Sequence, residues 1–278
     1  MFMRVPLLLI GAVTSSSLVA CVGAAPESVG SDPTSSTATA IVVVERSAGP
    51  GDAVRGDAVI ARFVRVRQGA VDDPALRMAG VTDDIPLAGT CLPPSDSTPV
   101  IQNRTVELLD VGQVVLSGEG SKSTVLLPRS MPDPAGVVSG VFYSSRATDA
   151  FAGGSRVSLR ANGGADLLDG FSVSVTAPHD IADVRVASGI PGLEVSWDVA
   201  DADPHDLVYV DVLSPSPRVA MRCAATDAGH LVIPSQFLAG IDEGQLAVHR
   251  LHKESFKAKG IEPGEVRFDV AKVVTFRR

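Results

Sequence analysis

The residues of this chain that could do chemistry are few, and the densest group is an acidic loop. Four carboxylates occur within nine residues, at Asp198, Asp201, Asp203 and Asp206. Carboxylate oxygens are good ligands for calcium, which takes about six to eight oxygen ligands. The spacing is not that of an EF-hand, and Asp and Pro also favour plain turns. We therefore interpret the loop as a solvated turn between two strands, with a calcium site as the alternative.

Two histidines form the other candidate metal site. His249 and His252 are three residues apart, a spacing that places both on one face of a helix but on opposite faces of a strand. A zinc site would need a further ligand, and no ligand motif accompanies the pair. We expect a solvated polar pair there, and we predict no metal and no other cofactor for the chain.

Sequence signatures of known enzymes are missing. The chain has no G-x-S-x-G, H-E-x-x-H, C-x-x-C or G-x-x-x-x-G-K-[ST] motif. The glycine-containing stretch 118–123 lacks the spacing of a phosphate loop, so we interpret it as a hairpin connection. These observations favour a protein that is not an enzyme. The alternative is an extracytoplasmic hydrolase whose carboxylates converge only in the folded chain.

Three cysteines are present, at Cys21, Cys91 and Cys223. Cys91 and Cys223 are 132 residues apart, and in an oxidising compartment an even pair invites a disulfide. A bridge would constrain the unfolded chain by about 4–5 kcal/mol on the loop-entropy argument. Two separately buried thiols are the alternative, because free Cys behaves as a small core residue. No base is identifiable beside either cysteine, so neither is predicted to be a nucleophile.

The N-terminus has the layout of a secretory signal peptide over residues 1–20. A short segment containing Arg4 precedes an apolar run over residues 5–13, which is too short for the ~20 residues of a membrane-spanning helix. The sequence Leu18-Val19-Ala20-Cys21 then resembles the lipobox of bacterial lipoproteins. The resemblance implies that acyl chains such as palmitate are attached through Cys21, which becomes the mature N-terminus. Two chains anchor a protein where one is marginal.

The same resemblance predicts a location. Val22, not Asp, follows the cysteine, so in a host with two membranes we expect the outer membrane instead of inner-membrane retention. Residues 21–40 are rich in Ser, Thr, Ala, Gly and Pro and predict a flexible tether between lipid and folded body. The expected partners are therefore the membrane, through the N-terminal lipid, and an envelope protein or glycan.

Charge excludes one class of partner. The net charge is −8, and it would become −9 on removal of residues 1–20, where Arg4 is the charged residue. Nucleic-acid binders need a basic surface for phosphate contacts, so we expect no nucleic-acid partner.

Beyond the tether, the chain shows the pattern of an all-β protein. Short runs with β-branched residues alternate with clusters of Gly, Pro and Asp, and no long amphipathic helix separates them. This pattern predicts two tandem antiparallel β-sandwich domains, over residues 41–178 and 179–278. Strands are expected in the first domain at 41–45, 58–66, 105–109, 113–116, 124–127, 137–143, 156–160 and 171–175.

The second domain has a tighter pattern, with seven strands expected in about 98 residues. They are placed at 183–187, 193–199, 207–213, 218–224, 230–233, 245–251 and 265–276. The stretch Leu193-Glu194-Val195-Ser196-Trp197 resembles the second strand of a fibronectin type III or other Ig-like module, with its buried Trp. The later Leu246-Ala247-Val248-His249 lacks the tyrosine usual at that corner of the fold.

Two segments of this domain leave room for helix. Residues 234–240 have Pro at the start and Gly at the end, as a single helical turn would. Residues 245–259 contain neither Gly nor Pro and are compatible with partial helix. As a whole the chain also resembles β-rich lipoproteins of high-GC bacteria, a class with no agreed activity, through Gly89-Thr90-Cys91, residues 153–171 and the Trp197 strand. Taken together, the sequence predicts a lipid-anchored binding or structural module of the cell envelope.

Overall fold

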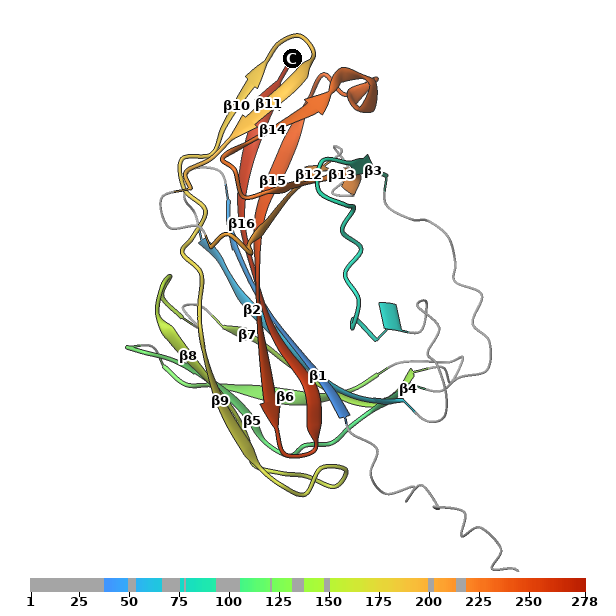
Figure 1. Ribbon diagram of the computed structural model, residues 1–278, viewed down its shortest axis with the longest axis vertical. Helices are drawn as coiled ribbons and strands as arrows, with labels where there is room; N and C mark the ends of the chain where they lie inside the picture. Colours follow the sequence, from blue (N-terminus) through green and yellow to red (C-terminus); the bar gives the residue numbers. More distant parts are fainter. Residues whose placement is uncertain are drawn as a thin grey trace, which may run out of the picture. The chain divides into compact units, whose positions relative to one another are not determined.

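The structure is a computed structural model, which describes residues 38–49, 54–66, 76–77, 79–93, 106–120, 122–131, 138–147, 151–199, 203–213 and 219–278. Nearly all of its regular structure is β-strand (Figure 1), so the prediction of an all-β fold is confirmed. Residues 36–278 form one compact unit.

The strands in chain order are β1 (Ala38–Ala48), β2 (Val54–Val66), β3 (Cys91–Leu92), β4 (Val106–Leu108), β5 (Val114–Gly118), β6 (Thr124–Ser130), β7 (Val138–Ala147), β8 (Arg156–Ala161), β9 (Phe171–Thr176), β10 (Arg185–Ser188), β11 (Gly192–Ser196), β12 (Leu207–Leu213), β13 (Val219–Thr226), β14 (His230–Pro234), β15 (Glu243–Ala258) and β16 (Ile261–Arg277). Each predicted strand overlaps one of these. The short helix η2 (Ser235–Leu238) confirms the helical turn expected after Pro234.

Within the described residues, thirteen strands form one continuous sheet, in the order β3-β13-β12-β15-β16-β1-β2-β4-β7-β6-β5-β8-β9. The sheet curls, because β9 comes back against β15, where the rings of Phe171 and Phe256 stack with centroids 6.1 Å apart. A separate three-stranded sheet has the order β10-β11-β14.

Two apolar cores lie against the long sheet. Inside its curl, alternate residues of β1, β2 and β16 meet those of β5, β8 and β9, among them Val42, Phe63, Leu159 and Phe268. A second core lies between the small sheet and strands β12, β13, β15 and β16 and includes Trp197. Strands β10 to β16 thus pack as three strands against four around this core, while the likeness to an Ig-like module stays a prediction.

The predicted boundary at residue 178 separates most members of the two cores. The long sheet nevertheless crosses it, because β16 pairs with β1 along their length, and Ile261, Val266, Phe268 and Val270 of β16 belong to the first core. Independent folding of the two predicted domains stays a prediction.

Two details of the strand predictions are wrong. The sheet is not wholly antiparallel: β1 pairs with β16, and β4 with β7, in parallel. Strands so distant in the chain need no short crossover helix between them, so the lack of helices did not exclude these pairs. The helical alternative for residues 245–259 is also wrong, because β15 is paired with β12 on one side and β16 on the other, which satisfies its backbone as a strand.

Candidate functional site

A row of polar side chains crosses the face of the long sheet that is turned away from both cores. Cross-strand pairing brings the members together: Tyr209 lies opposite His249, Asp211 opposite Arg222, and Glu45 opposite Asp269. Side chains alternate between the two faces of a strand, so residues in these registers share one face. We call these six residues the polar row.

Asp269 is the centre of the polar row. Its Oδ2 accepts a hydrogen bond from the Tyr209 hydroxyl at 2.6 Å, and its Oδ1 lies 2.9 Å from Nδ1 of His249. Burial would raise the pKa of Asp269, but the charge of His249 and the two hydrogen bonds outweigh it and hold that pKa below its usual value. Burial first, and then the Asp269 charge, raise the pKa of Tyr209 well above its ordinary value. The pair therefore consists of a neutral phenol and an ionised carboxylate.

His249 is enclosed between two carboxylates. Besides the Nδ1 contact with Asp269, its Nε2 lies 3.9 Å from Oδ2 of Asp211, and its ring stacks on Tyr209 with centroids 4.2 Å apart. Asp211 in turn accepts two hydrogen bonds from Arg222, each 2.7 Å long. Both nitrogens of the imidazole thus face acids of this chain, an arrangement that orients the ring rigidly.

Glu45 lies at the edge of this cluster, where a pocket of about 350 Å³ is lined also by Ser47, Tyr209, Arg222, His249 and Asp269. The pKa of Glu45 is raised, first by partial exclusion of water and second by the negative charge of Asp269. The pocket therefore holds two neighbouring carboxyl groups whose pKa values are displaced in opposite directions.

Residues 79–93, which we call the strap, lie over the same face of the sheet. Asp83 of the strap bonds to Arg267 of β16 at 2.7 Å and to Lys253 of β15 at 2.6 Å. Ile85 packs on a small apolar cluster around Tyr209 and Leu251. The strap is thus held by ion pairs and an apolar contact of the same sheet that carries the polar row.

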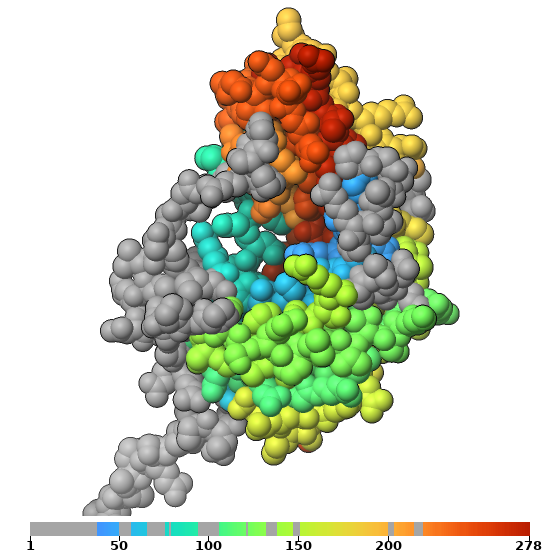
Figure 2. Space-filling view, turned by 180° about the vertical axis from the view of Figure 1, so that it is seen from behind, coloured from blue at the N-terminus to red at the C-terminus, as the bar shows by residue number. Residues whose placement is uncertain are grey.

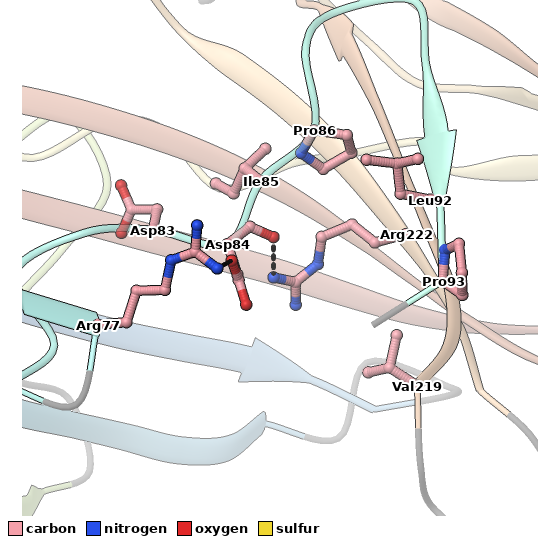
Figure 3. Close-up of a pocket in the computed structure, with 9 residues that line it drawn as sticks. All are labelled: Arg77, Asp83, Asp84, Ile85, Pro86, Leu92, Pro93, Val219 and Arg222. Atoms are coloured by element: carbon pink, nitrogen blue, oxygen red, sulfur yellow. Dashed lines mark hydrogen bonds and ion pairs between the residues drawn. The ribbon is translucent and has the colours of Figure 1, made fainter. Parts of the chain in front are cut away.

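Near its C-terminal end the strap is joined covalently to the long sheet. Cys91 lies opposite Cys223 of β13, and the two form a disulfide, which settles the alternatives that the sequence left open. Between the strap and β13 a second pocket of about 440 Å³ opens (Figure 3). On its wall Arg222 donates to the backbone oxygen of Asp84 at 3.1 Å, so one arginine links the strap to the polar row.

The acidic loop is only partly described, because Asp201 lies outside the described residues. Asp206 is buried and bonds to Nδ1 of His252 at 2.6 Å, and Asp203 accepts a hydrogen bond from the backbone of His205. Asp198 contributes its backbone oxygen to Arg250. Asp206 is thus paired with a basic side chain. Over the part of the chain that the structure describes, no three Asp, Glu, His or Cys side chains gather as a metal site would require.

Arg250 organises a buried ion network on the opposite face of β15. Its Nε donates to Asp227 at 2.7 Å, and its two terminal nitrogens donate to the backbone oxygens of His179 and Asp198. Asp227 also accepts a hydrogen bond from the indole of Trp197. The network ties strand β15 to the segments that enter and leave the small sheet, a structural role.

His249 and His252 lie on opposite faces of β15, as the strand interpretation requires. They serve separate clusters, one with Asp269 and one with Asp206, so they are not a joint metal site. Cys21 lies outside the described residues, and its lipidation stays a prediction.

Sequence reasoning did not single out the polar row. A signal was present in Val208-Tyr209-Val210-Asp211-Val212, where polar groups alternate with valines and so must share one face. Their partners on β15 and β16 follow only from the pairing of strands.

No protein-family model and no curated protein matches the sequence. A search of the described residues for a helix that is both long and apolar enough to cross a membrane finds none.

Proposed function

We propose that the chain is an exported, lipid-anchored binding module of the cell envelope, with its ligand site in the pocket beside Glu45. Export and anchoring are supported by the signal-peptide layout of residues 1–20 and the lipobox-like sequence ending at Cys21. The outer membrane is the proposed location in a host with two membranes.

One observation supports the ligand site above all: the side chains of the polar row are already held in fixed orientations. Asp269 is hydrogen-bonded to both Tyr209 and His249, and Arg222 is bonded to Asp211, so groups of the chain itself fix these side chains. Groups whose orientation is already fixed lose little conformational entropy on binding, which favours affinity. The imidazole nitrogens are directed at carboxylates of the chain, which suits a fixed binding surface better than proton transfer to a substrate.

The pocket favours a polar, hydroxyl-rich ligand. Glu45 and Ser47 offer an acceptor and a hydroxyl at its wall, beside the Asp269 carboxylate. Sugar hydroxyls both donate and accept hydrogen bonds, and bonds to charged groups are the stronger ones. An envelope glycan therefore suits this wall, and peptidoglycan is the probe we would use.

The test is co-sedimentation of the purified full chain with isolated peptidoglycan sacculi. We expect binding by the wild type and roughly tenfold weaker binding by Glu45→Gln, the loss of one charge-assisted hydrogen bond. Glu194→Gln, an exposed change on β11 of the small sheet, is the matched control and should bind like the wild type. Failure of the wild type to sediment, or equal binding by all three proteins, would contradict the proposed site.

A hydrolase is the second candidate, favoured by the opposite displacement of the Glu45 and Asp269 pKa values. In that role Glu45, protonated more readily than usual, would donate a proton to the leaving oxygen while Asp269 stays ionised. Release of soluble fragments from the sacculi by the wild type but not by Glu45→Gln would support it, and intact sacculi after prolonged incubation would exclude it for this substrate.

A further inference from the structure

The outer surface of strands β5, β6, β8 and β9 is basic although the chain as a whole is acidic. These four strands carry three arginines, Arg129, Arg156 and Arg160, and no Asp or Glu. The whole chain, in contrast, has 32 acidic against 24 basic residues. The contrast marks this surface as different from the rest of the molecule, and we call it the basic face.

The register of the strands shows that the basic face is one surface. Along β8, Val157 and Leu159 are buried in the first core while Arg156, Ser158 and Arg160 point outward. Arg160 lies beside Ser172 of β9 on one side and Val115 of β5 on the other. Figure 2 shows the green residues of β5 and β6 as a band on the surface turned to the viewer.

The arginines of the basic face are available to a partner. Arg156 and Arg160 are exposed, and neither forms an ion pair with any residue that the structure describes. Arg129 is also exposed and donates to the neutral hydroxyl of Ser144. Lys122 in the β5–β6 turn adds a fourth exposed positive charge, and that turn also carries an exposed acid, Glu119, whose backbone amide donates to the backbone oxygen of Arg156.

The basic face also exposes apolar side chains. Val125 is 44% exposed and Leu127 is 55% exposed, and both lie on β6 next to the arginines. Cationic side chains interleaved with apolar ones are the composition by which proteins lie at the interface of an anionic bilayer, with arginines near headgroup phosphates and apolar groups against the acyl boundary.

We propose that the basic face lies on the surface of an anionic phospholipid membrane. The start of β1 supports this orientation, because Ala38, which follows most of the predicted tether, is buried in the first core beneath the same strands. The tether segment from Cys21 to Ala38 reaches roughly 55 Å when extended, long enough for this face to meet the bilayer. The biological setting rests on the proposed lipid anchor, but binding of the face to lipid does not require it.

The test uses the full chain with Cys21→Ser, so that no acyl chain contributes, and flotation with vesicles. We expect binding to phosphatidylcholine vesicles that contain phosphatidylglycerol, weaker binding at higher salt, and little binding to phosphatidylcholine alone. In this background Arg156→Gln and Arg160→Gln should each weaken binding about fivefold. Leu127→Ser should weaken it too, without changing its salt dependence.

Arg185→Gln is the matched control, because Arg185 is an exposed arginine on β10 of the small sheet, and it should bind like its parent. Equal binding by the parent and the Arg156 and Arg160 variants, with unchanged melting temperatures, would overturn the proposal. Binding to soluble polyphosphate but not to vesicles would overturn it as well, in favour of a polyanion site. Since acylation is absent throughout, these results are independent of whether Cys21 is lipidated.

Discussion

Cys91 and Cys223 are 132 residues apart in the chain and lie directly opposite each other in the β3–β13 pair, joined by a disulfide. The bond fastens the end of the strap to the sheet whose face carries the polar row. At Ala224, the residue after Cys223, the strap also pairs through two backbone hydrogen bonds, since Gly89 donates to the oxygen of Ala224 and the Ala224 amide donates to the oxygen of Thr90.

Removal of this bond should weaken both the fold and the strap. For the Cys91→Ala, Cys223→Ala variant we expect the free energy of unfolding to fall by about 2–5 kcal/mol, because the unfolded chain regains the freedom that the long loop had lost. Urea unfolding measures the loss, and limited proteolysis should detect new cleavage within the exposed stretch around Leu87. An unchanged unfolding midpoint together with unchanged cleavage would show that the disulfide does not hold the strap.

Tyr209→Phe tests the centre of the polar row. The change removes the hydroxyl that donates to Asp269 and leaves that carboxylate with the His249 contact. We therefore expect the free energy of unfolding to fall by about 1–3 kcal/mol at neutral pH. The pKa of Asp269 is lowered in the folded chain, so its stabilising contribution is present above its ordinary value of 3.8 and is lost as pH falls through the folded value. Tyr209→Phe should therefore reduce the acid stability of the protein. Thermal unfolding from neutral to acidic pH measures this, and parallel curves for both proteins would refute it.

Arg250→Met tests the buried ion network. The variant leaves the buried Asp227 with the hydrogen bond from the Trp197 indole and removes the donors of the His179 and Asp198 backbone oxygens. We therefore expect the free energy of unfolding to fall by about 3–5 kcal/mol. Arg185→Met, at an exposed position of β10, is the control and should lie within about 0.5 kcal/mol of the wild type. Chemical denaturation of the three proteins measures these differences. Similar unfolding midpoints for both variants would contradict a stabilising role of the buried ion network.

His252 should make the stability depend on pH near neutrality. Its pKa is raised from 6.5 by the hydrogen bond with Asp206 against the opposing effect of burial, with smaller contributions from Asp203 and Glu254. A raised pKa means that the stabilisation is complete below 6.5 and is lost as pH rises through the folded value. His252→Gln should flatten this part of the pH profile of melting temperature. A wild-type profile that is already flat above pH 6.5 would contradict the assignment.

The sequence predicted the strands well because their signals are local. Alternation such as Phe171-Ser172-Val173-Ser174-Val175 shows which side chains face a core, and β9 buries Phe171 and Val175 as expected. Turn residues marked the ends of most strands, and Pro234 marked the start of η2. For residues 245–259 the local sequence is compatible with both a helix and a strand. Only pairing with β12 and β16, which are distant in the chain or follow later, determines that a strand forms.

The candidate site was harder to predict because it depends on long-range register. Glu45 and Asp269 are 224 positions apart and become neighbours only through the parallel pairing of β1 with β16. The acidic loop attracted attention by its density of charge, yet Asp206 is buried against His252. The β1–β16 pair is also the reason that one sheet crosses the predicted boundary between the two halves.

Anchoring to the membrane, the first part of the proposed function, requires that Cys21 is lipidated. The most direct measurement is intact mass and N-terminal peptide mass spectrometry of the full chain, expressed in a bacterial host and purified from its membranes. We predict a mature protein that begins at Cys21 and carries a diacylglycerol thioether, and accumulation of the unprocessed precursor when the cells are treated with globomycin. A chain that retains residues 1–20 without treatment, or that begins at an unmodified Cys21 or at another residue, would contradict the lipid-anchored module.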